Sequence, residues 1–229
     1  MTNKVAMISG ATRGIGLAIA LELDRAGYAL SLGVRRPDAV PDSLAAHLAH
    51  RYDARDRSSE RAWVDATMRR FGRIDVLVAN AGIGTFVDLE NGTDEALDDL
   101  FEVNVKAPFR LVRASLPHLK TSGAGRVVIV SSLSGKRVMG LNAGYQMSKH
   151  AMMALTHAVR RAGWDHGVRA TALCPGFVDT ELVAHVKDPP HEEMIDPADL
   201  ARLVATVVQL PNTAAIAELL VNCRYEHML

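Results

Sequence analysis

The 229-residue sequence has no excess of charge of either sign, few aromatic residues and few cysteines. Lys and Arg together number 26, as do Asp and Glu, so the formal net charge is zero. This balance excludes the strongly basic field with which proteins bind nucleic acids or anionic membranes. We therefore expect no nucleic-acid or membrane partner, and any anionic ligand has to be held by local charges.

Two further absences concern location. Cys174 and Cys223 do not form a C-x-x-C pair, and both lie in or beside apolar runs, which predicts buried, reduced thiols. No apolar stretch approaches the roughly 18–20 residues that cross a bilayer. No long apolar segment follows the first residues, so the pattern of a signal peptide is absent. These features predict a cytoplasmic protein.

Apolar residues make up 48% of the sequence and aromatic residues only 5%, so Ala, Val, Leu and Ile must form most of the core. Short apolar runs typical of buried strands alternate with segments of helical periodicity. We expect strands at 5–9, 29–34, near 52, 74–79, 126–130, 168–174 and 216–223. We expect helices at 14–26, to about 71 after a cap at Ser58 or Ser59, from Thr93 or Asp94 toward 119, at 143–163, and from 197 after a cap at Asp196.

This alternation predicts an α/β fold over residues 1–229, with no linker, repeat or low-complexity segment. The predicted architecture is a single-domain, Rossmann-type, doubly wound parallel sheet of about seven strands with helices on both faces. Such sheets bind ligands beyond the carboxyl ends of their strands. The motifs described next fall at those ends.

A glycine-rich turn joins the first predicted strand to the first predicted helix. Gly10, Gly14 and Gly16 follow a G-x-x-x-G-x-G spacing. Gly10 would permit a tight turn, Gly14 would let the backbone approach a pyrophosphate, and Gly16 would let helix and strand pack closely. Glycines before a helix are often only structural, but the flanking elements favour a dinucleotide site. The other residues of the turn that we assign to this site are Thr12, Arg13 and Ile15.

The end of the second predicted strand bears on the choice of cofactor. An acid at this position would bind the ribose 2′-hydroxyl and favour NAD(H), but the strand ends Gly33-Val34-Arg35-Arg36. Arg35 and Arg13 could grip a 2′-phosphate from two sides, because a planar guanidinium matches phosphate oxygens. The alternative is that both are solvated surface arginines. We predict NADP(H) over NAD(H).

Tyr145 and Lys149 are four residues apart in a predicted helix and so share one face. A nearby ammonium favours the phenolate and lowers the pKa of the phenol, which makes tyrosine usable as an acid–base. Ser132 ends the preceding strand, 13 positions before Tyr145, where its hydroxyl could hold a substrate oxygen. Taken singly, a surface Tyr-Lys pair and a turn serine are ordinary features.

Together these motifs resemble the classical short-chain dehydrogenase/reductase (SDR) family in order and spacing, over about residues 5–180. The motifs are the glycine turn, Asn80-Ala81-Gly82, Asn104, Ser132, Tyr145, Lys149 and Cys174-Pro175-Gly176. Ser9 stands where threonine is usual, Ala79 replaces the first asparagine of an Asn-Asn-Ala-Gly motif, and the glycine-rich close of the family is missing. The last departure puts the substrate pocket and oligomer contacts in doubt.

The resemblance implies roles for individual residues. Tyr145 resembles the proton donor or acceptor, and Ser132 the residue that orients the carbonyl, with Ser131 the weaker candidate. Lys149 resembles the residue that binds the nicotinamide ribose and lowers the tyrosine pKa, and Asn104 the asparagine that helps hold a proton-relay water. The remaining residues assigned to cofactor binding are Asp53 at the adenine, Asn80, Ala81 and Gly82 beside the central strands, Pro175, Gly176 and Val178, and Thr180 at the nicotinamide amide.

The predicted enzyme is an NADP(H)-dependent oxidoreductase that transfers hydride between the nicotinamide and a small-molecule carbonyl or secondary alcohol. Alternatives are an oxidative hydroxy-acid or alcohol dehydrogenase and, less favoured, a non-catalytic dinucleotide-binding regulator. No metal is expected, and the resemblance implies a homodimer or homotetramer. Residues 181–195 form a possible lid, Leu133, Val138, Met139, Leu141 and Phe177 could edge an apolar pocket, and Arg137 could hold a carboxylate.

Overall fold

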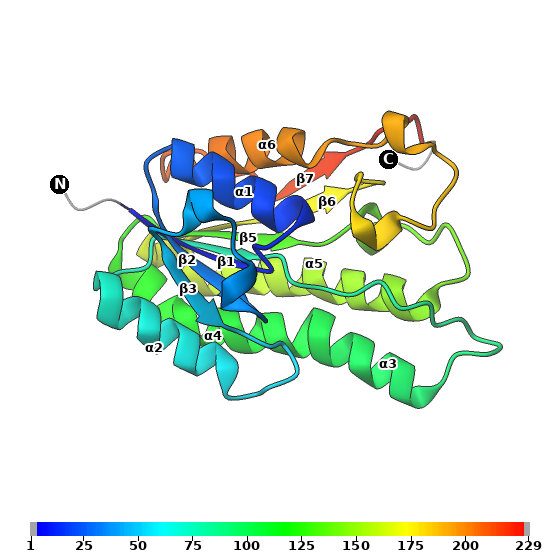
Figure 1. Ribbon diagram of the computed structural model, residues 1–229, viewed down its shortest axis with the longest axis horizontal. Helices are drawn as coiled ribbons and strands as arrows, with labels where there is room; N and C mark the ends of the chain where they lie inside the picture. Colours follow the sequence, from blue (N-terminus) through cyan, green and yellow to red (C-terminus); the bar gives the residue numbers. More distant parts are fainter. Residues whose placement is uncertain (1–3, 227–229) are drawn as a thin grey trace.

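The computed structural model describes residues 4–226, which form a seven-stranded parallel sheet with helices on both faces (Figure 1). The strand order is β3-β2-β1-β4-β5-β6-β7, and every neighbouring pair is parallel. The strands are β1 (Val5–Ser9), β2 (Ala29–Val34), β3 (Leu48–Arg51), β4 (Val76–Ala79), β5 (Arg126–Val130), β6 (Arg169–Pro175) and β7 (Glu218–Val221). The Rossmann-type doubly wound sheet predicted from the sequence is confirmed.

Helices α1 (Gly14–Arg25) and α6 (Pro197–Gln209) cover one face of the sheet. The opposite face carries α2 (Ser59–Phe71), α4 (Ala107–Thr121) and α5 (Ala143–Gly163), with α3 (Asp94–Phe101) preceding α4 (Figure 1). No helix within residues 4–226 is long and apolar enough to span a bilayer.

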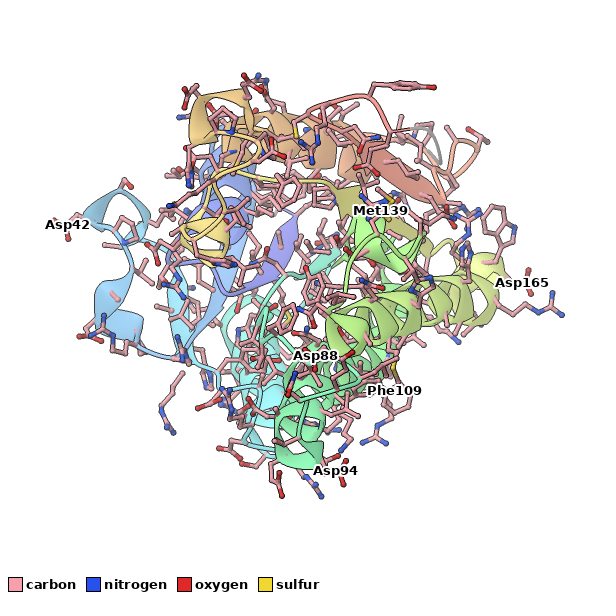
Figure 2. All side chains as sticks on the ribbon, turned by 90° about the vertical axis from the view of Figure 1, so that its right-hand side faces the viewer. Asp42, Asp88, Asp94, Phe109, Met139 and Asp165 are labelled. Carbon is pink, nitrogen blue, oxygen red and sulfur yellow. The ribbon has the colours of Figure 1, made fainter. Side chains whose placement is uncertain are left out.

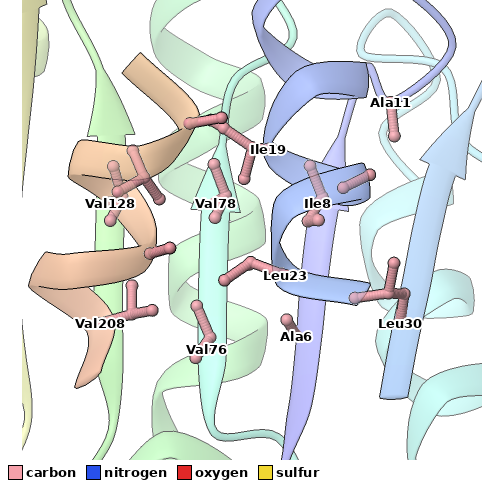
Figure 3. Packing of buried hydrophobic residues seen from close by; sticks show 14 of the residues in the cluster. Ala6, Ile8, Ala11, Ile19, Leu23, Leu30, Val76, Val78, Val128 and Val208 are labelled. Carbon is pink, nitrogen blue, oxygen red and sulfur yellow. The ribbon is translucent and has the colours of Figure 1, made fainter. Parts of the chain in front are cut away.

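Two buried apolar clusters, one on each face, hold the layers together. Strand residues such as Ile8, Val76 and Val128 meet Ile19 and Leu23 of α1 and Val208 of α6 (Figure 3). Because successive strand residues point to opposite faces, Met7, Leu77 and Val127 enter the second cluster instead. Strands buried on both sides explain the continuous apolar runs in the sequence.

Helix caps agree with the sequence at two helices and differ at a third. Thr93 accepts a hydrogen bond from the Ala96 N–H at 3.2 Å, and Asp196 accepts one from the Ala198 N–H at 2.8 Å, as their positions predict. The predicted serine cap of α2 is wrong. Ser58 makes no capping bond, and the Ser59 hydroxyl donates to the Asp53 and Asp56 carbonyls because the preceding turn brings them within 2.8 Å.

The single long helix predicted from residue 93 or 94 toward 119 is interrupted. A π-helical turn (Glu102–Lys106) separates α3 from α4 and places Asn104 toward the protein interior, where only 2% of it is exposed. Turns of this kind widen the helix locally and are frequent at functional sites. The carboxyl ends of the strands, and with them this turn, face the site described next.

Candidate active site

The glycine turn after β1 has the shape that its spacing predicts. Gly10 adopts φ +71°, and its N–H donates to the Gly33 carbonyl of β2 at 2.8 Å. Gly16 leaves no room for a side chain, because a Cβ there would lie 2.2 Å from the Gly10 carbonyl oxygen and 2.4 Å from Nδ2 of Asn80. Helix α1 begins with no side-chain cap and no acid in its first turn. Its amide groups are therefore available to an anion.

Asn80, after β4, ties the β1 and β4 loops together. Its N–H donates to the Ser9 hydroxyl at 2.9 Å, and its amide nitrogen donates to the carbonyls of Ser9 and Gly10 at 2.9 and 3.3 Å. The Ser9 hydroxyl also accepts from the Ala81 N–H at 3.0 Å. The strand order reverses between β1 and β4, so these contacts stabilise what we call the switch point of the sheet, where open α/β sheets bind their ligands.

Three charged residues assigned to the adenosine end lie at the carboxyl ends of β1, β2 and β3. Arg35 follows β2, is exposed, and has no ion-pair partner among residues 4–226. Asp53 follows β3 and is half-buried, and its carboxylate accepts from the Arg55 N–H at 3.1 Å. Arg13, in the glycine turn, forms an exposed ion pair with Glu181. Sequence reasoning did not anticipate this partner.

Ser132 and Tyr145 lie together where β5 ends and α5 begins. The Ser132 side chain lies close enough to the Tyr145 phenol to lower its pKa. The Ser132 hydroxyl accepts from the Ser134 N–H at 3.1 Å and donates to the Pro175 carbonyl of β6 at 3.4 Å. Ser131, the weaker candidate, is buried and donates to the Lys149 carbonyl at 2.9 Å. It anchors α5 instead of pointing at Tyr145.

Lys149 is 7% exposed, one turn after Tyr145 on α5. Its ammonium donates to the Val130 carbonyl at 3.1 Å and lies 5.5 Å from the centre of the Tyr145 ring. No carboxylate within the described residues pairs with it. Burial without an opposite charge lowers the pKa of Lys149 to about 8.

The pKa of Tyr145 differs in direction from the prediction. Burial raises it above its ordinary value of 10, and the hydrogen bond from Ser132 opposes this rise only in part. Lys149 is not among the groups that shift the pKa of Tyr145, so the expectation that Lys149 lowers this pKa stays a prediction. The phenol is protonated at neutral pH.

Asn104 uses both ends of its amide on the loop after β4. Its Oδ1 accepts from the Ile83 N–H, and its Nδ2 donates to the Ile83 carbonyl, both at 2.9 Å. Nδ2 also lies 3.2 Å from the Ser148 hydroxyl of α5. The side chain thus links the switch point to the helix that carries Tyr145.

Asn142 is a site residue that sequence reasoning missed. Its Oδ1 accepts from the N–H groups of Tyr145 at 3.2 Å and Val87 at 3.0 Å, which caps α5 and ties the loop after β4 to it. An asparagine directly before a predicted helix start is the signal that could have found it.

The residues assigned after β6 lie close to the glycine turn. Thr180 contacts Gly14, since a Cβ at Gly14 would lie 3.2 Å from Thr180 Cγ2, and its hydroxyl donates to the Val178 carbonyl at 3.2 Å. Val178 forms a parallel bridge with Ile195. Both are buried, so the proposed lid segment 181–195 is anchored in the core at its far end. Gly176 follows Pro175 of β6, and its N–H donates to the Val221 carbonyl of β7.

The far side of the site is bounded by residues after β7. Arg137 is already occupied, because its guanidinium makes bonds of 2.6 and 2.7 Å to the carboxylate of Glu226, with side chains only 9% and 12% exposed. Arg137 is expected from the sequence to hold a carboxylate at the substrate pocket, but the carboxylate that it holds is that of Glu226. Of the apolar residues expected at the pocket, Leu133 is buried, Phe177 is half-buried, and Val138, Met139 and Leu141 are 67%, 61% and 79% exposed.

Figure 2 looks onto this edge and shows Met139 and Asp88 facing the viewer, with residues 181–195 in gold beside the blue elements. The arrangement fits a nicotinamide dinucleotide. The start of α1 can bind phosphates, and the buried ammonium of Lys149 can bind ribose hydroxyl groups next to Tyr145. Within residues 4–226, no group of three or more His, Cys, Asp or Glu could hold a metal ion.

The comparisons with known proteins agree with this geometry. The family model described as short chain dehydrogenase matches residues 4–190. An agropine synthesis reductase of Rhizobium rhizogenes is 43% identical over 230 residues, covering 98% of this chain and 53% of the relative. The chain thus spans about half the length of this curated relative.

Among solved structures, an alcohol dehydrogenase of the archaeon Thermococcus sibiricus complexed with 5-hydroxy-NADP is 34% identical with a TM-score of 0.89, and 98% of each chain is covered. A 3-ketoacyl-(acyl-carrier-protein) reductase of Brucella melitensis complexed with NADH is 27% identical with a TM-score of 0.88, covering 96% of this chain and 97% of that one. Structures of this shape therefore bind nicotinamide dinucleotides of both kinds.

Proposed function

The chain belongs to the short-chain dehydrogenase family, whose members act on CH–OH and C=O groups, and we propose that it is an NADP(H)-dependent reductase of a small carbonyl compound, able to work in reverse on the alcohol. The observation that carries this proposal is the grouping of Ser132, Tyr145 and Lys149 at the ends of β5 and α5. The nicotinamide, when bound, supplies or accepts the hydride.

Tyr145 donates the proton to the carbonyl oxygen in the reductive direction. Burial raises the pKa of Tyr145, so the phenol carries the proton that this role needs. The raised pKa also makes the phenol a weaker donor, so a neighbouring group has to stabilise the phenolate. Ser132 lies beside the phenol and is placed to hold the same oxygen. Lys149 would bind the nicotinamide ribose, and its ammonium, 5.5 Å from the centre of the Tyr145 ring, favours the phenolate that remains after proton transfer.

Asn104 and Asn142 act as positioning residues. Asn104 connects Ile83 to α5, and Asn142 caps α5 three residues before Tyr145. A general acid has to lie within hydrogen-bond reach of the group that it protonates, so fixing the start of α5 fixes the reacting geometry.

The preference for NADP(H) rests on the positive charge at the adenosine end. Arg35 is exposed and without an ion-pair partner among residues 4–226, and β2 ends in Val34 followed by two arginines, with no acid at this position to bind a ribose 2′-hydroxyl. Arg13 is the second cation. Hydrogen bonds to a charged group contribute about 1.5–3 kcal/mol each, less at an exposed site. Neighbours with both types of cofactor leave this choice to experiment.

The test is kcat/KM for NADPH and NADH with a panel of ketones and aldehydes, and the reverse reaction with secondary alcohols and hydroxy acids. We expect kcat/KM with NADPH to exceed kcat/KM with NADH by roughly 30-fold or more, and Val34→Asp to shift this ratio toward NADH. Equal values for the two cofactors would contradict the cofactor assignment. If the chain binds NADPH tightly but converts none of the tested compounds, a dinucleotide-binding regulator would be favoured.

The oxidative dehydrogenase of an alcohol or hydroxy acid stays the second candidate, because the same groups serve both directions. The cytoplasmic location and the homodimer or homotetramer stay predictions, and sedimentation of the purified chain tests the second.

A further inference from the structure

Three consecutive residues after β6 bridge the switch point. Thr180 contacts Gly14 of the glycine turn, and Glu181 pairs with Arg13 of the same turn. Leu182 packs against the loop after β4, since a Cβ at Gly84 would lie 3.2 Å from Leu182 Cδ1. The segment therefore touches both loops between which a dinucleotide has to bind.

The ion pair between Arg13 and Glu181 is unusual for its place. Both side chains are exposed, at 63% and 66%, and the two residues are 168 positions apart. The uncapped amide groups of α1 and the Arg13 guanidinium attract a phosphate to the start of this helix. The Glu181 carboxylate lies at the same place and repels that phosphate, because both carry negative charge. Glu181 thus occupies the cation that an anionic ligand would need.

We propose that Glu181 is a cofactor-specificity residue, whose carboxylate competes with the 2′-phosphate of NADP(H) for Arg13. The inference rests on the proposed function, since it takes Arg13 as a ligand of that phosphate. NADP(H) has to release Glu181 from Arg13, whereas NAD(H) has no 2′-phosphate and leaves the pair in place. Because Glu181 begins the segment 181–195, the two cofactors leave this segment in different states.

The competition has a defined sign and size. Removing the carboxylate frees Arg13, so Glu181→Gln tightens NADPH binding. An exposed ion pair of this kind is worth little, and we expect the Kd for NADPH to fall about two- to fivefold at low salt. The Kd for NADH falls less than twofold. High salt screens the ion pair and therefore narrows the difference in the Kd for NADPH between Glu181→Gln and the native protein.

The experiment measures Kd for NADPH and for NADH by fluorescence titration, without turnover, for the native chain and Glu181→Gln. Asp179→Asn is the matched control, because Asp179 is an exposed carboxylate two residues earlier whose partner is His191, at 2.6 Å, and not Arg13. The control should leave the ratio of the two Kd values unchanged. Glu181→Gln in an Arg13→Gln background should have no effect on NADPH, because the cation that both anions seek is gone.

The results separate the two hypotheses. A native chain that binds NADPH and NADH equally contradicts the proposed cofactor preference and this inference with it. A native preference for NADPH that Glu181→Gln does not increase, or an equal tightening of both cofactors, overturns only the competition at Arg13. A larger Kd ratio in Glu181→Gln that disappears in the double variant supports it.

Discussion

The catalytic region (residues 131–149) and the carboxyl-terminal region (residues 177–226) border the same site but are held by different forces. In the first, Ser131 bonds the Lys149 carbonyl and Lys149 bonds the Val130 carbonyl, all within buried surroundings. In the second, α6 packs in the buried core, but the loops on either side of it are linked by exposed ion pairs, such as Asp179–His191 and Asp188–Arg224. Buried backbone contacts fix a geometry, whereas exposed ion pairs contribute little and respond to salt.

This difference suggests a division of labour. The groups proposed to move the proton are held by buried hydrogen bonds, while Thr180 and Glu181, which lie against the glycine turn, begin a segment that exposed ion pairs hold. Changes in the first region should therefore act on kcat, and changes in the second on binding and on salt dependence. The following variants test this contrast.

The largest effect is expected in the catalytic region. Tyr145→Phe removes only the phenol oxygen, so kcat should fall by about 10²–10⁴, the usual contribution of a positioned general acid. The Kd for NADPH and the melting temperature should change little. Tyr28→Phe is the control, because Tyr28 is buried in the core directly before β2, at the opposite end of that strand from Arg35. Near-native turnover by Tyr145→Phe would remove this residue from the mechanism.

Lys149→Met should exchange activity for stability. The pKa of Lys149 falls from its ordinary 10.5 to about 8 on folding, so the folded protein resists holding this charge. At pH 7 the neutral side chain should stabilise the protein by up to about 3 kcal/mol, the free energy equivalent of this pKa change. Because the unfolded chain binds the proton more tightly, the native protein gains stability as pH rises from about 8 to 10.5.

Urea unfolding of both proteins at pH 7, 9 and 10.5 tests this expectation. The difference in unfolding free energy between Lys149→Met and the native chain should shrink as the pH rises. Lys149→Met should also bind NADPH more weakly than the native chain at every pH. A variant that is less stable than the native chain at pH 7 would show that the Val130 hydrogen bond outweighs the cost of burial.

The Arg137–Glu226 pair joins the two regions and differs from the exposed pairs, because it is nearly buried and bidentate. Arg137→Met leaves Glu226 without its partner and should cost about 1.5–3 kcal/mol of unfolding free energy. Adding Glu226→Leu should restore part of this loss, since an apolar pair needs no compensation. Thermal unfolding of the single and double variants measures both. Additive losses would mean that the two residues do not act as a pair.

The contrast between the regions also separates what the sequence could and could not predict. The bounds of β1, β2, β5 and α5 follow from local apolar patterns. Of these elements, α5 carries both Tyr145 and Lys149. The interruption at Asn104 does have a local signal, because Pro108 has no N–H to bond the Asn104 carbonyl, but helical periodicity alone does not reveal it. The pairs at Arg13 and Arg137 join residues 168 and 89 positions apart, beyond any local pattern.

The raised pKa of Tyr145 has a similar origin. A four-residue spacing predicts that Lys149 lies near the phenol, and it does, but the spacing carries no information on how deeply both are buried. Sequence patterns therefore predict which groups meet, and the packing around them decides their protonation.

The smallest effect is expected at Arg224, which lies 3.2 Å from Asp188 and above the Phe177 ring, 5.7 Å from its centre. Asp188 is 85% exposed, so Arg224→Ala should change the unfolding free energy by less than about 0.5 kcal/mol. Its effect should instead appear in substrate KM, because Arg224 connects the segment 181–195 to the residues after β7. Asp188→Asn should reproduce this KM change, and 0.5 M salt should remove it in both. A stability loss above 1 kcal/mol would show that the carboxyl-terminal region is held as firmly as the catalytic one, and the proposed contrast would fail.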